Sequence, residues 1–139
     1  MRGTPLILTV DDEEIIHIIL DKMIHHLGYC PIHASGVSHA LRTIRELRPD
    51  VILLDIILPG GNCDEIIEAV RSTPELRNTG IILITHSEDH REIAKHIEAG
   101  ADDFLLKPFN TTLFKARINN TLALISHRNM SAPRAASAG

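Results

Sequence analysis

Cysteine and aromatic residues are scarce in this sequence. It has two Cys, three Phe, one Tyr and no Trp among 139 residues. Cys30 and Cys63 lie far apart and form no Cys-x-x-Cys pair, which argues against a disulfide framework or a zinc site. A cytoplasmic location, where thiols stay reduced, is therefore expected.

Long apolar runs and an excess of positive charge are also absent. The longest apolar runs hold a handful of residues, far short of the ~20 that span a bilayer, and the first residues lack the composition of a secretion signal. The net charge is −4, and no segment carries the basic stripe that is typical of nucleic-acid-binding surfaces. We therefore expect no membrane and no nucleic acid among the partners of these residues.

The sequence does contain short aliphatic runs that alternate with longer segments of helical period. With 44% hydrophobic and 23% charged residues over 139 positions, it has the composition and length of one ordinary globular domain. The predicted strands are 6–10, 29–34, 51–55, 81–85 and 103–107, and the predicted helices are 13–27, 37–48, 64–72, 88–99 and 111–127. Five such alternations with continuously apolar strands predict an α/β fold with a doubly wound, five-stranded parallel sheet.

Polar residues collect where the predicted strands end. Asp55 ends VILLD, the most apolar strand, although burying an unpaired carboxylate is costly. Other predicted strands end in Asp11–Asp12, Thr85–His86 and Lys107. The carboxyl ends of parallel strands lie along one edge of the sheet, where open α/β sheets bind their ligands. Strands often end in polar residues at a surface, but that explanation does not predict these residue types together.

Three clustered carboxylates beside an ammonium group favour a particular chemistry. The carboxylates repel one another, so a pKa rises or a cation binds, and their hard oxygens suit Mg²⁺ together with a phosphate oxygen. Lys107 would add a second positive charge, and Thr85 would donate a hydrogen bond to a phosphoryl oxygen. With its charge compensated, an oxygen of Asp55 would attack phosphorus, because phosphoryl transfer depends mainly on positioning and electrostatics.

Four motifs give the chain a resemblance to a known family. They are LTVDDEE at the first strand, VILLDIILPGG around the third, IILIT at the fourth and AGADDFLLKPF at the fifth. From about residue 5 to about residue 125 the chain resembles the receiver domain of two-component response regulators, including the single-domain chemotaxis and phosphorelay receivers. The resemblance implies a flavodoxin-like (βα)5 fold and a role in phosphorelay signal transduction. A receiver is consumed as a substrate and does not turn over small molecules, so we do not expect an enzyme.

The resemblance also implies roles for the acids at the strand ends. Asp55 is similar to the phospho-acceptor aspartate, which takes a phosphoryl group from a sensor histidine kinase or a histidine phosphotransfer protein. Asp11 and Asp12 resemble the acid pair that binds Mg²⁺ (or Mn²⁺), with Asp55 and the backbone carbonyl of Ile57 as further ligands.

A second group of residues is similar to those that respond to phosphorylation. Thr85 matches the switch hydroxyl, Lys107 the lysine that contacts phosphate, and Phe104 the aromatic switch residue. Lys107–Pro108 is expected to be a cis peptide, which X-Pro bonds tolerate. The surface formed by residues 88–125 is expected to carry the signal to a downstream target or to an output domain.

Four positions depart from the usual pattern of the family, and one of them, Phe104, lacks only the hydroxyl of the tyrosine found in many relatives. His86 stands where a small residue is common, and its imidazole is expected to narrow access to Asp55 or to contact the phosphoryl group. Cys63 stands where a glycine is common, so the loop before it is expected to take another shape. Ile57 offers no side chain to orient an attacking water, which predicts a long-lived phosphoryl state. Most of the other histidines are interpreted as exposed helix residues.

Two alternative functions remain open from the sequence. The chain would be a pseudo-receiver, a phosphorylation-independent protein-binding module, if His86 and Cys63 mark an impaired site. A phosphatase of the haloacid dehalogenase type also uses an aspartate nucleophile after a strand. It needs a second acid two residues later, where this sequence has Ile57, so this alternative is disfavoured.

The domain organisation follows from composition near the end of the chain. We assign residues 1–128 to the receiver domain and expect a flexible tail or linker at 129–139, because SAPRAASAG has the composition of a linker. Two interpretations of the chain remain open: it is a stand-alone receiver, or it is the receiver part of a longer protein whose output domain would follow the linker.

Overall fold

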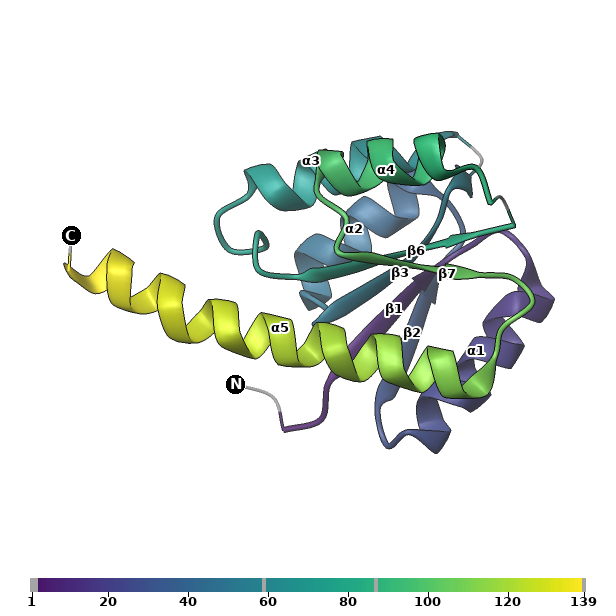
Figure 1. Ribbon diagram of the computed structural model, residues 1–139, viewed down its shortest axis with the longest axis horizontal. Coiled ribbons are helices and arrows are strands. Elements are labelled where there is room, and N and C mark those ends of the chain that lie inside the picture. The colour runs from purple at the N-terminus through teal and green to yellow at the C-terminus, as the bar shows by residue number, and fades with distance from the viewer. Residues whose placement is uncertain (1–2, 59, 87, 139) are drawn as a thin grey trace.

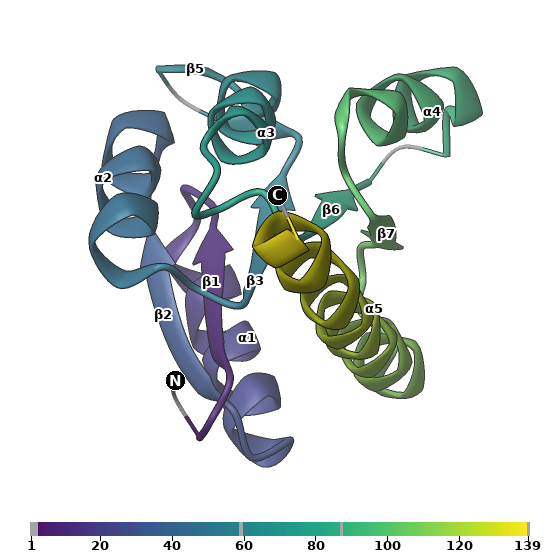
Figure 2. The same cartoon turned by 90° about the vertical axis from the view of Figure 1, so that its left-hand side faces the viewer.

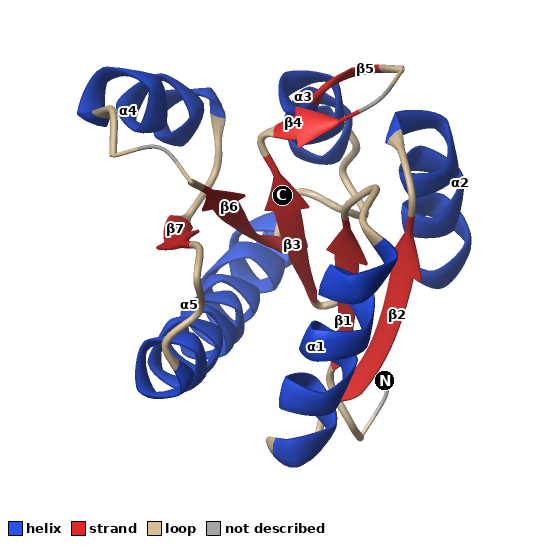
Figure 3. Cartoon of the chain, turned by 90° about the vertical axis from the view of Figure 1, so that its right-hand side faces the viewer, coloured by secondary structure: helices blue, strands red, loops and turns tan. Residues whose placement is uncertain are grey.

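A five-stranded parallel sheet forms the centre of the protein in the computed structural model. The structure describes residues 3–58, 60–86 and 88–138, with side chains up to residue 129. The strands of this sheet are β1 (Leu6–Val10), β2 (Cys30–Ala34), β3 (Val51–Asp55), β6 (Gly80–Thr85) and β7 (Asp103–Leu106), in the spatial order β2-β1-β3-β6-β7. Neighbouring strands are parallel, as the arrows in Figure 3 show. The predicted α/β fold with a doubly wound parallel sheet is confirmed.

The composition of each strand matches its place in the sheet. The central strands β3 and β6 are completely buried and rich in Ile and Leu, as strands covered on both faces require. The edge strand β2 is partly exposed and carries Pro31, a residue that central strands avoid. The chain crosses from β2 to β3 on the other side of β1, so the strand order reverses there. Because Val10 pairs with Leu54, Asp11 and Asp55 leave the sheet side by side at this reversal.

Helices cover both faces of the sheet, as Figures 1 and 2 show. One face carries α1 (Glu14–His26) and α5 (Thr111–Ala138), and the other carries α2 (Val37–Leu47), α3 (Cys63–Ser72) and α4 (His90–Ala99). Leu20 of α1 and Phe114 of α5 belong to one buried cluster, whereas Ile44 of α2 and Ile67 of α3 belong to the other. The sheet therefore separates two apolar layers, and its carboxyl edge is left for polar side chains.

The loop predicted at residues 58–62 contains a small hairpin. In it β4 (Ile57–Leu58) pairs with β5 (Gly61–Asn62) in antiparallel orientation, and Pro59 lies outside the described residues. The Asn62 side chain accepts a hydrogen bond from the Asp64 N–H at 2.8 Å, and the Glu65 carboxylate accepts one from the Asn62 N–H at 3.3 Å. This capping box fixes the start of α3. Strands of two residues have no periodicity, so the sequence did not indicate the hairpin.

The last helix is longer than the sequence predicted. It begins at Thr111 as expected, but it continues past residue 127 to Ala138, and Figure 1 shows its final turns extending beyond the sheet. Alanine is frequent there and has the highest helix propensity, whereas the composition as a whole indicated a linker. The domain boundary at residue 128 stays a prediction. None of the helices in the described part of the chain is both long and apolar enough to span a membrane.

Candidate functional site

Asp11, Asp55 and Lys107 meet at the carboxyl edge of the sheet. The Lys107 Nζ lies 2.9 Å from Asp55 Oδ2 and 3.3 Å from Asp11 Oδ2. The exposed fraction of these side chains is 5% for Lys107, 11% for Asp55 and zero for Asp11. Three of the predicted site residues, each at the end of a different strand, therefore form one buried charged cluster.

The charges in this cluster act on one another. Burial raises the pKa of Asp55, and its contact with Asp11 raises it further, against the opposing effects of the Ile57 N–H and of Lys107. Burial lowers the pKa of Lys107, but its hydrogen bond with Asp55 and the negative charges of Asp55 and Asp11 outweigh this, so that the pKa is raised. The ammonium group therefore stays charged at neutral pH, and the site has more negative charge than Lys107 alone compensates.

An acidic group at the start of α1 adjoins this cluster. Carboxylate oxygens of Asp11, Asp12 and Glu13 lie within 4.8 Å of one another, and Asp12 and Glu13 are exposed. The Glu13 Oε1 also lies 3.8 Å from the Lys107 Nζ. The structure thus brings the predicted pair Asp11 and Asp12 together and adds Glu13, which the sequence analysis did not single out. The third acid in the DDEE run was the signal that could have indicated it.

Thr85 and the peptide after Lys107 lie on the same edge. Thr85 is buried at the end of β6, one residue beyond Ile84, which pairs with Asp55. Its carbonyl accepts a hydrogen bond from the Lys107 N–H at 2.9 Å. The Lys107–Pro108 peptide is cis, as predicted. The backbone therefore holds Thr85 and Lys107 next to each other.

Three other residues singled out in the sequence differ in how they relate to this cluster. The Ile57 N–H donates to Asp55 Oδ1 at 2.9 Å, while the Ile57 side chain is 80% exposed. Phe104 is half-buried against the apolar layer of α2 and α3, with the Arg117 guanidinium 6.0 Å from its ring centre. His86 is exposed and lines a groove of about 540 Å³ together with Lys107.

Two of the histidines on the helices are buried. His17 lies on the buried face of α1 with Leu20 and Ile24, a spacing that places three residues on one side of a helix. Its Nε2 lies 2.7 Å from the Asp11 carbonyl oxygen, so the imidazole supports the backbone of the acidic site. His96 is buried beside Ile93 on the inner face of α4. The interpretation of most of the other histidines as exposed helix residues is confirmed, and His17 and His96 are the buried exceptions among the described residues because each lies on the inner side of its helix.

Comparison with known proteins shows the family of the chain. The response regulator receiver domain family matches residues 7–119. The chain belongs to this family. The receiver is 33% identical over 118 residues to the transcriptional regulatory protein AfsQ1 of Streptomyces coelicolor. It is 31% identical over 120 residues to the phosphate regulon transcriptional regulatory protein PhoB of Escherichia coli.

These alignments cover most of this chain and about half of each relative. They include 85% and 86% of the receiver but 51% and 52% of AfsQ1 and PhoB. The chain therefore spans about half the length of the relatives that it matches.

Solved structures share the fold. A chain from Chloroflexus aurantiacus described as a response regulator superposes with a TM-score of 0.83 at 30% identity, covering 87% of the receiver and 99% of that chain. The chemotaxis response regulator CheY4 of Vibrio cholerae superposes with a TM-score of 0.80 at 25% identity, covering 86% and 99%. The predicted receiver fold is confirmed, and the chain is a signalling domain of two-component phosphorelays.

Proposed function

We propose that Asp55 accepts a phosphoryl group from the phosphohistidine of a sensor histidine kinase or a histidine phosphotransfer protein. One observation supports this most directly: the buried Asp55 carboxylate has an oxygen 2.9 Å from the Lys107 ammonium. The other oxygen accepts a hydrogen bond from the Ile57 N–H at 2.9 Å, so the carboxylate is held in one orientation. A fixed nucleophile beside a compensating cation suits phosphoryl transfer, which depends on positioning and charge.

The donor set around Asp55 fits Mg²⁺ (or Mn²⁺). The carboxylates of Asp11, Asp12 and Asp55 and the Ile57 carbonyl offer the hard oxygen ligands that these cations prefer. The raised pKa of Asp55, caused by burial and then by Asp11, is consistent with a site that lacks positive charge. A bound divalent cation would compensate the charge of the carboxylates and of the incoming phosphoryl oxygens.

The residues of the chain itself would then perform the transfer. An Asp55 oxygen forms a bond to phosphorus while the phosphorus–nitrogen bond of the donor breaks and its imidazole leaves. The Lys107 ammonium pairs with a phosphoryl oxygen, and the Thr85 hydroxyl donates to another. Phe104 turns inward as Thr85 moves, which alters the surface of residues 88–125. Hydrolysis of the acyl phosphate restores Asp55, so the domain modifies only itself and is not an enzyme with turnover.

The altered surface would act on a downstream partner. AfsQ1 and PhoB are named as transcriptional regulators, and the receiver spans about half their length. We propose that residues 88–125 bind either an output domain of the same protein or a separate target in the cytoplasm. We do not propose that the receiver itself binds nucleic acid, because the whole chain has a net charge of −4.

Incubation of the purified chain with acetyl phosphate and Mg²⁺ tests the proposal. Intact-mass measurement should show the addition of one phosphoryl group to the wild type and none to Asp55→Asn. Asp103→Asn is the matched control, because Asp103 is a half-buried aspartate at the start of β7. Labelling that persists in Asp55→Asn would exclude Asp55 as the acceptor, and an unlabelled wild type would favour the pseudo-receiver.

A further inference from the structure

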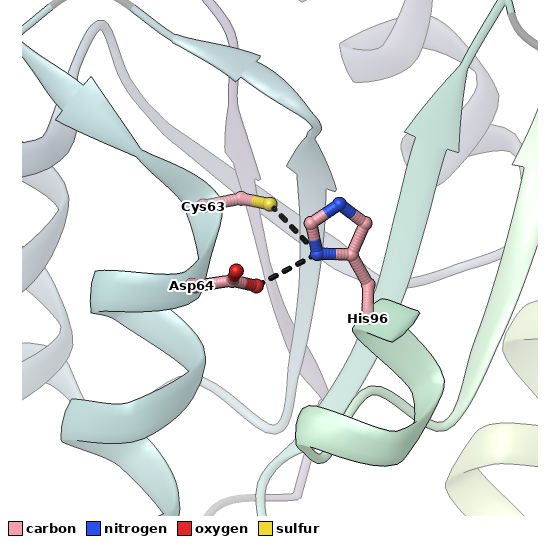
Figure 4. A group of neighbouring side chains, drawn as sticks. All are labelled: Cys63, Asp64 and His96. Atoms are coloured by element: carbon pink, nitrogen blue, oxygen red, sulfur yellow. Dashed lines mark hydrogen bonds and ion pairs between the residues drawn. The ribbon is translucent and has the colours of Figure 1, made fainter. Parts of the chain in front are cut away.

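A second group of side chains with metal-binding chemistry lies between α3 and α4. Cys63 and Asp64 are the first two residues of α3, and His96 lies in α4. The His96 Nδ1 is 3.6 Å from the Cys63 Sγ and 2.7 Å from Asp64 Oδ1. Figure 4 shows the three side chains pointing toward one another. We call these three residues the α3–α4 cluster.

The geometry of the α3–α4 cluster differs from that of a nucleophile and its base. In such an arrangement one ring nitrogen faces the thiol and the other faces the carboxylate. Here the thiol and the carboxylate both approach Nδ1, as the two dashed lines in Figure 4 show. One nitrogen carries at most one proton, so it does not relay a proton between these partners. Sulfur, nitrogen and oxygen that face a common point are the ligand types that a transition-metal ion takes.

We propose that Cys63, Asp64 and His96 form a binding site for Zn²⁺ or a similar divalent transition metal, independent of the proposed phosphorylation site. A tetrahedral ion with a Zn–S bond of about 2.3 Å and a Zn–N bond of about 2.0–2.1 Å separates these two ligand atoms by about 3.6 Å. The distance between the Cys63 Sγ and the His96 Nδ1 is 3.6 Å. The cysteine spacing argues against a zinc site made of two cysteines, whereas this site uses one.

The carboxylate is the ligand that has to move. Tetrahedral coordination places a carboxylate oxygen about 3.4 Å from the imidazole nitrogen, so Asp64 Oδ1 must withdraw from Nδ1 by less than about 1 Å. The Asp64 side chain is 37% exposed, against 9% for that of His96. It therefore has room to rotate while the buried Cys63 and His96 keep their positions.

A groove beside the α3–α4 cluster leaves space for a fourth ligand. The cavity has a volume of about 670 Å³ and is lined by all three residues and by Glu92. Glu92 precedes His96 by four residues in α4, which places both on the same side of the helix. The fourth position is therefore open to water or to the Glu92 carboxylate.

The charges around Cys63 favour a cation. Burial raises the pKa of the Cys63 thiol to about 12, and the negative charges of Asp64, Asp55 and Glu92 add to the effect. The same charges attract a divalent ion, and a coordinating thiol loses its proton to solvent on binding. The bound ion would join α3 to α4 directly after the hairpin that follows Asp55.

Titration of the reduced, metal-free chain with Zn²⁺ and with Co²⁺ in excess Mg²⁺ tests this proposal. Excess Mg²⁺ occupies the sites made of hard oxygen ligands. The binding of Zn²⁺ and Co²⁺ that remains therefore reports the site with sulfur and nitrogen ligands. We expect one ion per chain and a thiolate-to-Co²⁺ charge-transfer absorption band. Cys63→Ser should abolish the band, and His96→Gln should weaken Zn²⁺ binding by at least the ~10–100-fold that loss of a supporting partner costs. Cys30→Ser, at the exposed cysteine, is the matched control and should change neither the absorption band nor the Zn²⁺ affinity.

Three results would overturn the proposal. They are the absence of a thiolate band in the wild type, loss of the band in Cys30→Ser, and Zn²⁺ affinity unchanged in His96→Gln, which would assign binding to surface histidines. Circular dichroism of each variant checks that it is folded. If Cys63→Ser unfolds, His96→Gln and Asp64→Asn decide the result, since Asp64 is partly exposed. Asp12→Asn, in the acidic group at the start of α1, should leave the Zn²⁺ affinity unchanged.

Discussion

Asp55 is a buried carboxylate whose neighbours have opposing effects on its charge. Burial and Asp11 raise its pKa, while the Ile57 N–H and Lys107 lower it, and the pKa is raised from its ordinary value of 3.8. The folded chain therefore binds more protons than the unfolded chain at pH values between 3.8 and the folded pKa. The free energy of unfolding consequently falls as the pH rises through this interval.

Asp55→Asn should therefore stabilise the metal-free protein at neutral pH. The neutral amide does not repel Asp11, so the free energy of unfolding should increase by about 1 kcal/mol. In a domain of this size, such an increase raises the melting temperature by roughly 2–4 °C. Thermal unfolding followed by circular dichroism in EDTA, between pH 4 and 8, measures the effect. The variant should also lose the part of the pH dependence of the melting temperature that the titration of Asp55 causes. Mg²⁺ should raise the melting temperature of the variant less than that of the wild type. Equal melting temperatures at every pH would contradict this account of Asp55.

Ile57 should control the lifetime of the phosphoryl group. Its side chain is 80% exposed and its N–H is bonded to Asp55, so a polar side chain there would meet water beside the acceptor. An amide orients water without taking its proton, so Ile57→Gln should speed hydrolysis by about tenfold, less than the ~10²–10⁴ of a positioned general base. Decay of the acyl phosphate measured by intact mass checks this, with Ile57→Val as the control. An unchanged half-life in Ile57→Gln would show that this position does not govern access of water.

The residues of the site were predictable from the sequence only in part. Asp11, Asp55 and Lys107 lie at the ends of strands, and parallel strands place their carboxyl ends on one edge whatever the detailed packing. His17 and His96 depend on how a helix is rotated against the sheet, which residue type does not reveal. Asp64 meets His96 across two helices that are distant in the sequence, and no local pattern indicates that contact.

At the scale of elements, Asp102 connects three parts of the fold. Its carboxylate accepts hydrogen bonds from the Ile81 N–H of β6 at 2.9 Å and from the Arg71 guanidinium of α3 at 3.0 Å, and it also pairs with Arg128 of α5. Only 7% of the Asp102 side chain is exposed. Asp102 therefore joins a helix from each layer to a central strand.

Asp102→Ala should destabilise the receiver by about 3–5 kcal/mol, because removing one member of a buried ion pair leaves the other charge uncompensated. The neighbouring Asp103 provides a matched control. Its carboxylate lies 3.6 Å from Arg117, and the two side chains are 25% and 36% exposed. Asp103→Ala should therefore cost less than about 1 kcal/mol. Urea unfolding measures both, and similar losses for the two variants would contradict the central role of Asp102.

The elements themselves were predictable where the sequence has a period or a continuous apolar run. The strands and the starts of the helices lie within two residues of the predicted positions. The hairpin of β4 and β5 was missed because its strands have two residues each. The end of α5 was misplaced because Ala-rich composition is common to linkers and helices, and only the three-dimensional structure distinguishes them.

At the scale of the whole molecule, the acidic site and the surface of residues 88–125 share one pair of strands. Lys107 follows β7, its N–H binds the Thr85 carbonyl at the end of β6, and its ammonium binds Asp55. Lys107 therefore connects Asp55 to the ends of β6 and β7, in addition to the direct pairing of Asp55 with Ile84 of β6. The other edge of the sheet, β2, is separated from β6 by β1 and β3.

This arrangement predicts where the receiver changes when Asp55 is occupied. Beryllofluoride with Mg²⁺ mimics the phosphoryl group and would draw the Lys107 ammonium and the Thr85 hydroxyl toward it. The resulting population shift should move amide resonances across residues 85–110, with small changes in β2 as the internal control. Heteronuclear NMR of the wild type measures these shifts, and Asp55→Asn should show none. Shifts confined to the residues next to Asp11 and Asp55 would mean that the ligand binds without switching the surface, as in a pseudo-receiver.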